Sequence, residues 1–305
     1  MIKRIIRISD RKRILNFFRA RQNCKLDYCF KIQSHKTGPS VLIIASTHGN
    51  EIVGGNFTIR FVKKLEKRKI KLLRGNIYFL LANPEALKKD KRFVDYNLNR
   101  AFTDKKDLNK YEFRRAQEIE RFFKNKKIDF VIDLHSVSAD NSQMLVLRND
   151  FINKLKNIMH KSKLPFAFIY NKGDIPGTVM DIFYNKNIKA VTIECGNHFK
   201  RSSMKIAEHE VFNILSSLNM LHIDTHDTEH KMKAFEVIEH IPADEDFKWK
   251  VEAKTGVKIS KGQVFAESKN LGKIKASADS VLFMPSAKVD KNDTDAGFLC
   301  KETYI

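Results

Sequence analysis

The sequence predicts an α/β sheet flanked by helices, followed by a smaller β-rich C-terminal domain. Short apolar runs alternate with amphipathic helical periods through the first two-thirds of the 305 residues. After about residue 225 the pattern changes to short period-two segments separated by glycines. We therefore expect an α/β domain over residues 1–225 and a β-rich domain over residues 226–305.

Four continuous apolar runs predict strands of the first domain. Because both faces of such a strand are covered by helices, its residues need not alternate between apolar and polar. The runs are VLIIAS (41–46), IYFLLA (77–82), FVIDL (130–134) and AVTIE (190–194).

Helical periods lie between these runs. Ile52, Phe57, Phe61 and Leu65 recur at helical spacing after the first strand. The segment YEFRRAQEIERFFKN (111–125) is a second amphipathic helix, with an apolar side formed by Phe113, Ile119, Phe122 and Phe123.

The C-terminal third begins with a polar segment. HIDTHDTEHKMKAF (222–235) is rich in charge and is predicted to be a linker. His222, His226 and His230 would share one face if this segment were helical, but the interspersed Asp and Thr favour a solvated linker over a metal site. VKISKGQVFAES (257–268) and KIKASADSVLFMPSA (273–287) then alternate as β-strands do.

Composition indicates the compartment of the protein and the kind of partner it binds. No apolar run reaches the roughly 20 residues of a membrane-spanning helix, and the four cysteines form no C-x-x-C pair, so a cytoplasmic protein with reduced thiols is expected. The net charge is +21, and residues 1–40 hold 11 Lys or Arg against 2 Asp or Glu. We interpret this N-terminus as an amphipathic surface segment rather than a transit peptide. The positive field favours small anionic substrates over nucleic acid, because no nucleic-acid-binding motif is present.

Polar side chains follow three of the predicted strands. STHGNE (46–51) places His48 and Glu51 three positions apart at a sharp turn, where Gly49 permits the bend. This spacing alone also fits a helix cap. His135 follows FVIDL and offers a third ligand from an independent strand end, with Asp133 on the same strand face. Two histidines and one carboxylate with an open position are a catalytic zinc set.

Two further segments carry charge suited to catalysis. Glu194 ends the apolar run AVTIE, where a carboxylate is costly unless it is paired with a lysine or used as a general base. Its neighbour Cys195 has no evident His-Asp partners that would make it a nucleophile. KRFVDYNLNRAF (91–102) concentrates Arg92, Asn99 and Arg100, which either bind a substrate carboxylate or lie in a solvated loop.

An ordered set of motifs resembles one enzyme family. STHGNE, NPEA (83–86), RFVDYNLNRAF, EFRRAQEI, DLHS and IECG together resemble the aspartoacylase and succinylglutamate desuccinylase family, which are zinc amidohydrolases related to the zinc carboxypeptidases. The resemblance covers about residues 41–200 and is closer to aspartoacylase. It implies a carboxypeptidase-like mixed sheet, with a β-rich C-terminal domain that caps or flanks the active site.

The resemblance also implies roles for individual residues. His48, Glu51 and His135 would hold one Zn²⁺ per chain, and Glu194 would be the general base. Arg92 would polarise the scissile carbonyl together with the zinc, and Asn99 and Arg100 would hold a substrate carboxylate. The implied reaction is hydrolysis of a small anionic N-acyl amino acid, without a specific nucleic acid or a membrane as partner; a homo-oligomer is compatible with the sequence.

Departures from the family pattern bear on the substrate. Asn97 stands where an aspartate is common, and Met180 and Asp181 lie near the position of a substrate-binding arginine. SAKVDKNDTDAG (286–297) lacks a counterpart of a C-terminal tyrosine. These departures argue against N-acetylaspartate. The alternatives are a zinc metallocarboxypeptidase acting on peptides and a catalytically degenerate basic binding protein.

Overall fold

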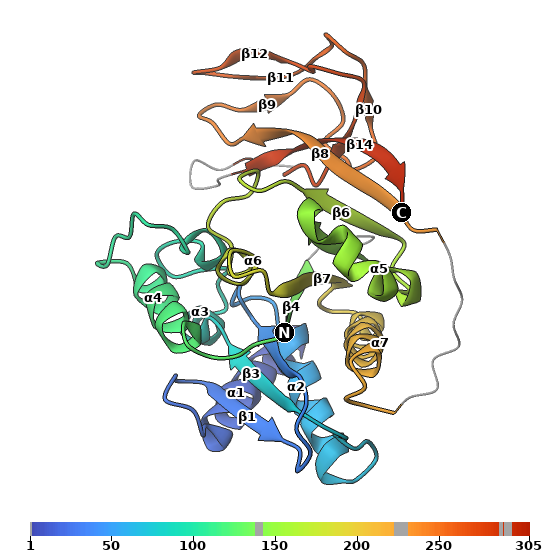
Figure 1. The fold of residues 1–305 in the computed structure, drawn as a ribbon. Helices are drawn as coiled ribbons and strands as arrows, with labels where there is room; N and C mark the ends of the chain where they lie inside the picture. The colour runs from blue at the N-terminus through green and yellow to red at the C-terminus, as the bar shows by residue number, and fades with distance from the viewer. Residues whose placement is uncertain (1, 138–142, 223–230, 287–288, 290–294) are drawn as a thin grey trace. The chain divides into compact units, whose positions relative to one another are not determined.

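The computed structural model describes residues 2–137, 143–222, 231–286, 289 and 295–305 (Figure 1). The chain divides into two compact units. The first is Met1–Pro165 with Ile175–His230, and the second is Phe166–Asp174 with Lys231–Ile305. The predicted α/β class with a smaller β-rich C-terminal part is confirmed.

A mixed sheet forms the centre of the first unit, with strands in the order β1-β3-β2-β4-β7-β5. The four inner strands run parallel, and β1 and β5 pair antiparallel at its two sides. All four predicted strands are among the inner ones. The strands are β1 (Cys29–Gln33), β2 (Ser40–Ala45), β3 (Asn76–Leu81), β4 (Phe130–Val137), β5 (Gln143–Arg148) and β7 (Lys189–Asn197).

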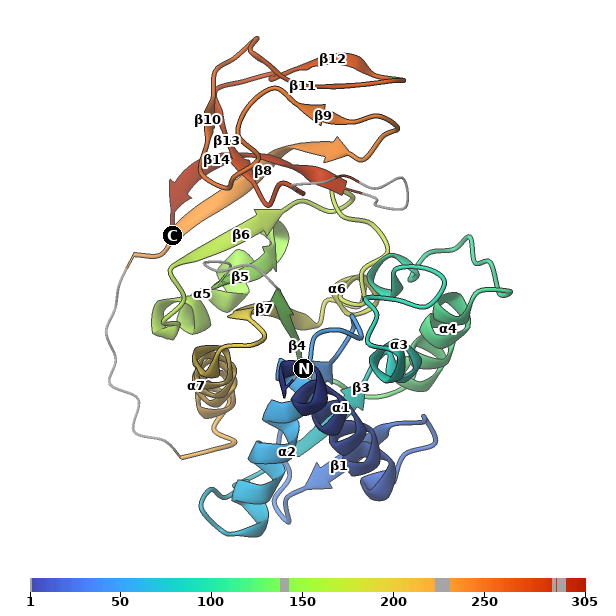
Figure 2. The ribbon, with the colours of Figure 1, turned by 180° about the vertical axis from the view of Figure 1, so that it is seen from behind.

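Helices cover both faces of this sheet (Figures 1 and 2). Consecutive strand residues point to opposite faces, so Phe79 packs on Phe61 of α2 while Tyr78 packs on Phe123 of α4. The helical periods predicted around residues 52–65 and 111–125 correspond to α2 and α4. The helices are α1 (Ile2–Arg21), α2 (Val53–Glu66), α3 (Pro84–Lys89), α4 (Tyr111–Phe123), α5 (Ile152–Lys161), α6 (Asp181–Tyr184) and α7 (Arg201–Ser217), with 3-10 turns η1 (Leu98–Arg100) and η2 (Asn149–Phe151).

The second unit is built from strands around its own apolar core. β6 pairs parallel with β8, and β14, β13 and β10 continue that sheet antiparallel, while β12, β11 and β9 form a smaller one. Ile241, Phe265, Leu282 and Leu299 are at most 1% exposed in its core. The strands are β6 (Phe166–Tyr170), β8 (Lys233–Pro242), β9 (Lys248–Trp249), β10 (Lys258–Ile259), β11 (Val264–Ser268), β12 (Gly272–Lys275), β13 (Ser280–Phe283) and β14 (Asp295–Tyr304).

The predicted linker is only partly described. Residues 223–230, which include the boundary at 225/226, His226 and His230, lie outside the described residues. The linker prediction over 222–235 is wrong at its end, because β8 begins at Lys233 and buries Ala234 and Phe235. In the parts of the chain that the structure describes, no helix is long and apolar enough to cross a membrane.

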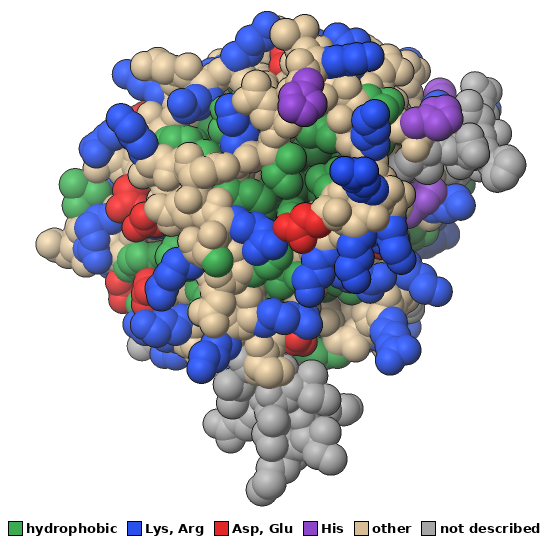
Figure 3. Space-filling view, turned by 90° about the horizontal axis from the view of Figure 1, so that it is seen from below, with side chains coloured by type: hydrophobic (Ala, Val, Ile, Leu, Met, Phe, Trp, Pro, Cys, Tyr) green, Lys and Arg blue, Asp and Glu red, His purple; other side chains and the backbone are tan. Residues whose placement is uncertain are grey.

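Basic side chains are spread over the surface rather than confined to one element. Figure 3 shows Lys and Arg across one face, with a few acidic groups among them. A shallow hollow in the first unit is lined by His35, Lys36, Lys71 and Arg74 together with Thr37 and Leu73. This distribution fits a general positive field that attracts small anions.

Candidate active site

Three parallel strands bring the candidate residues to one edge of the first unit's sheet. β2, β4 and β7 are neighbours and run in the same direction, so their carboxyl ends meet. Ala45 pairs with Leu134, and His135 pairs with Glu194. The turn after β2 therefore lies beside the ends of the other two strands.

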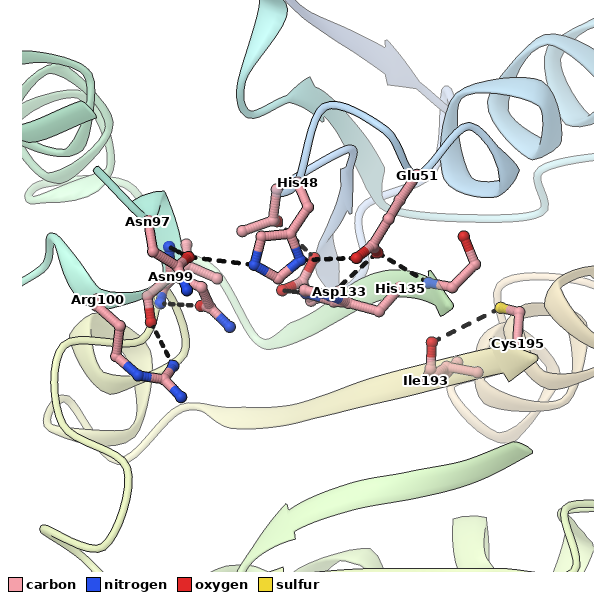
Figure 4. A network of polar contacts seen from close by, with 12 residues as sticks. His48, Glu51, Asn97, Asn99, Arg100, Asp133, His135, Ile193 and Cys195 are labelled. Carbon is pink, nitrogen blue, oxygen red and sulfur yellow. Dashed lines mark hydrogen bonds and ion pairs between the residues drawn. The ribbon is translucent and has the colours of Figure 1, made fainter. Parts of the chain in front are cut away.

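The turn after β2 is shaped by packing against α3. Ser46 adopts φ 52°, and its hydroxyl donates to the carbonyl of Glu51 at 2.8 Å. A Cβ added to Gly49 would lie 2.1 Å from the carbonyl carbon of Ala86, so glycine is required by close approach rather than by a positive φ. The N-cap of α2 is Ile52. The Glu51 carboxylate does not cap the helix but turns toward the two histidines (Figure 4).

His48, Glu51 and His135 form one compact buried cluster. Their ligand atoms lie within 4.8 Å of one another, and the residues are 3–4% exposed. Nδ1 of His48 lies 2.7 Å from one Glu51 oxygen, and Nδ1 of His135 lies 3.3 Å from the other. The second oxygen also accepts the backbone N–H of Ser136 at 2.8 Å. The cluster thus presents two imidazole nitrogens to one carboxylate.

The outer nitrogen of each imidazole is fixed by an acceptor. Oδ1 of Asn97 lies 3.1 Å from Nε2 of His48 and also accepts the N–H of Asn99, so His48 donates from Nε2. Nε2 of His135 donates to Asp133 at 2.8 Å, and Thr47 donates to the other oxygen of Asp133. With Nε2 as the donor in both rings, the lone pair of Nδ1 faces Glu51. Histidines that bind metals are usually held in this way, with the other ring N–H donating to an acceptor.

The surroundings shift the pKa values of the two histidines in opposite directions. Burial, with the charge of Arg92, lowers the pKa of His48 to about 4. Burial opposes ionisation of Glu51, but the charges of the two histidines lower its pKa well below the ordinary value. Burial also opposes protonation of His135, yet Asp133 and Glu51 raise its pKa well above the ordinary value. Acceptor atoms this close require a proton or a metal cation between them, and the donor set fits a divalent cation.

Glu194 is a buried carboxylate beside this cluster. It is 8% exposed, and among the described residues its Oε2 has no hydrogen-bond partner. Burial raises its pKa to about 7, although the charge of His135 opposes the shift. A carboxyl group with this pKa can take up and release a proton near neutral pH.

The loop before α4 brings further polar groups to the cluster. Arg92, whose side chain is 51% exposed, lies 3.5 Å from Glu51 through Nη1. Oδ1 of Asn99 accepts the backbone N–H of Val179 at 3.0 Å, and Nη1 of Arg100 donates to the carbonyl of Asn99 at 2.7 Å. Figure 4 shows Asn97, Asn99 and Arg100 on the His48 side of the cluster.

One neighbouring residue agrees with the interpretation of the sequence, and one has a contact that the sequence did not indicate. Cys195 is fully buried, its Sγ donates to the carbonyl of Ile193 at 3.6 Å, and burial raises its pKa well above the ordinary value, so it is no nucleophile. Asn97 contacts His48, a role that the sequence did not predict. The sequence offered one indication of this role, because Asn97 lies two residues before the candidate substrate residue Asn99.

Comparisons with known proteins identify the family of this chain. Residues 37–218 match the succinylglutamate desuccinylase/aspartoacylase catalytic domain. Aspartoacylase from Rattus norvegicus is 35% identical over 127 residues, which are 37% of this chain and 39% of the relative. An N-acyl-aromatic-L-amino acid amidohydrolase (carboxylate-forming) from Xenopus laevis is 30% identical over 115 residues, 35% of this chain and 37% of the relative.

The matched stretch thus spans about two fifths of the length of these curated relatives. The fold extends further along the chain. A crystal structure of succinylglutamate desuccinylase from Vibrio cholerae has a TM-score of 0.71 at 16% identity and covers 91% of this chain and 89% of its own. The family match covers more than half of the sequence, and the chain belongs to the succinylglutamate desuccinylase/aspartoacylase family.

Proposed function

We propose that this protein is a zinc-dependent amidohydrolase that cleaves an N-acyl amino acid into a carboxylate and a free amino acid. The observation that carries the proposal is that His48, Glu51 and His135 converge beside Glu194. One oxygen of Glu194 has no hydrogen-bond partner among the described residues. Family membership and the names of the two curated relatives support the same reaction class.

The donor set favours zinc over harder cations. Two imidazole nitrogens and one carboxylate are a common catalytic zinc set, and three protein ligands leave a position for water or substrate. When bound here, the ion would act as a Lewis acid toward the scissile carbonyl and would lower the pKa of water. His48, Glu51 and His135 would hold it.

The chain's own residues would carry the proton transfers and the charge stabilisation. Glu194 would take a proton from the attacking water and then deliver it to the amine leaving group, for which a pKa near 7 is well suited. Arg92 reaches toward the cluster and would donate to the oxyanion that develops on the carbonyl oxygen.

The loop residues would supply substrate recognition. Asn99 and Arg100 offer an amide and a guanidinium for the carboxylate of the amino-acid half. Near the position of the family's other substrate arginine, Met180 is 3% exposed and Asp181 accepts the N–H of Thr178. The curated relatives are named for different substrates, so acyl group and amino acid have to be found by a screen.

The test combines metal analysis with hydrolysis. We expect about one zinc per chain, activity toward at least one N-acyl amino acid in a set of acetyl, succinyl and longer acyl groups, and loss of activity after chelation. Short peptides serve as the comparison. Release of C-terminal residues from peptides by the zinc-loaded protein, with no N-acyl amino acid cleaved, would identify a carboxypeptidase instead.

Replacing Arg100 with lysine should weaken substrate binding. A lysine keeps the charge but loses the planar fork that pairs with a carboxylate, so KM is expected to rise about 10-fold or more with a smaller change in kcat. Arg114→Lys is the matched control, because Arg114 is exposed and donates to the Leu108 and Asn109 carbonyls. Equal KM values for the two variants would remove Arg100 from the substrate site.

A further inference from the structure

The segment that carries the proposed substrate residues has no regular structure of its own. Residues 91–97 form neither helix nor strand, yet Arg92 and Asn97 contact the His48–Glu51–His135 cluster from it. Asn99 and Arg100 follow in the short turn η1. Irregular backbone can hold such side chains in place only if its polar groups have other partners.

Glu112 supplies these partners. This residue in the first turn of α4 is 0% exposed, and its carboxylate accepts three successive backbone N–H groups of the loop: Val94 at 2.6 Å, Asp95 at 3.0 Å and Tyr96 at 3.1 Å. The side-chain amide of Asn83 donates to it at 3.3 Å. Hydrogen bonds to an ionised acceptor are the stronger kind, and both oxygens are occupied.

The loop and the helix start hold each other. Asp95 accepts the N–H of Tyr111, the first residue of α4, at 2.8 Å while its own N–H donates to Glu112. This reciprocal pair satisfies one donor at the helix end and one in the loop. The rings of Tyr96 and Phe113 stack beside it, with centroids 4.7 Å apart. A carboxylate in the first turn of α4 is also favoured by the helix dipole.

The far side of the loop touches the candidate active site. The carbonyl of Arg92 accepts the N–H of Gly49 at 3.0 Å, and Asn97 contacts the outer nitrogen of His48. A displacement of residues 94–96 would therefore move both the proposed oxyanion donor and the group behind a metal ligand.

We propose that Glu112 is a positioning residue that holds the segment Arg92–Arg100 in its active geometry. The inference rests on the proposed function for the roles of Arg92, Asn99 and Arg100. Glu112 is the first residue of the EFRRAQEI motif, and the amphipathic pattern of that helix does not explain a buried glutamate at this position. Glu112 touches neither the metal ligands nor, in this assignment, the substrate.

The test replaces Glu112 with glutamine, which keeps one acceptor oxygen but turns an NH₂ group toward two of the four donors. Glu118→Gln is the matched control, with the same chemical change on the exposed side of α4. Hydrogen exchange at Val94, Asp95 and Tyr96 is expected to accelerate about 10-fold or more in E112Q, compared with the wild type at saturating zinc.

Enzyme kinetics provide a second measurement. A variant that is merely less stable would lose activity equally toward both substrates. We expect kcat/KM to fall about 10- to 100-fold in E112Q, and to fall further for an N-acyl amino acid than for its carboxamide analogue. The ratio of these two values should stay at the wild-type level in E118Q. Because the two substrates differ only in the carboxylate, the ratio of their kcat/KM values reports on the contact with that group.

Three outcomes would overturn the inference: unchanged exchange at residues 94–96 in E112Q, an unchanged substrate ratio, or equal effects in E118Q. If E112Q does not fold, exchange in the wild type is the test, because the amides of Val94, Asp95 and Tyr96 must then be better protected than the amide of the exposed Lys105. If the wild type cleaves no N-acyl amino acid, the proposed function fails, while the exchange data still decide whether Glu112 anchors the loop.

Discussion

Glu194→Gln is expected to lower kcat by about 100- to 10,000-fold while zinc content per chain stays at the wild-type level. The amide has nearly the shape of the carboxylate but cannot take a proton from water. Glu194 is 8% exposed, and its Oε2 has no partner among the described residues, so the substitution breaks no ion pair recorded there. The loss should therefore appear in the chemical step, measured by kcat at saturating substrate and by metal analysis of the same sample.

A buried carboxylate elsewhere in the first unit provides the control. Glu210 in α7 is 1% exposed and accepts the backbone N–H of Lys163 at 3.0 Å. Glu210→Gln makes the same chemical change on a helix rather than at the end of a strand, and it is expected to lower stability while kcat remains near the wild-type value. If E194Q kept near-full activity on a substrate that the wild type hydrolyses, the assignment of Glu194 as general base would be wrong.

The sequence predicted the centre of the site because parallel strands impose one rule. Apolar runs located the strands, and the polar residues directly after them had to meet at the carboxyl edge of the sheet. His48, Glu51 and His135 were selected in this way, and the structure gathers their ligand atoms within 4.8 Å. For Glu194 the sequence left an ion pair or a general base open. The resemblance favoured the base and supplied the role of Arg92, and both roles stay predictions.

The contacts that position these residues could not be predicted, because they follow no periodic pattern in the sequence. Glu112 holds backbone groups 16 to 18 residues earlier in the chain, and Asn97 contacts a histidine 49 residues away. Side-chain to backbone contacts of this kind leave no signal in hydropathy. Hydropathy also gives no signal that groups Phe166–Asp174 with Lys231–Ile305, since a short buried strand has the same apolar pattern in either unit.

His48→Ala is expected to abolish both zinc retention and hydrolysis. In the proposed site the imidazole would be one of three ligands, and its removal would leave Glu51 and His135 as an incomplete set. Loss of a contact behind a ligand typically weakens metal affinity about 10- to 100-fold, so loss of the ligand itself should exceed this range. Asn97→Ala, which removes the acceptor of His48 Nε2 and of the Asn99 N–H but no ligand, should fall within that range and give a graded comparison.

Metal titration and thermal denaturation would measure this series directly. Zinc should raise the melting temperature of the wild type, raise it less for N97A and leave that of H48A unchanged, because only a ligand bound to the folded state stabilises it. His240→Ala is the control, since His240 also pairs with a carboxylate, Asp295 at 2.6 Å, but lies in the second unit. Retention of one tightly bound zinc by H48A would place the metal elsewhere and separate the family resemblance from the chemistry proposed for this cluster.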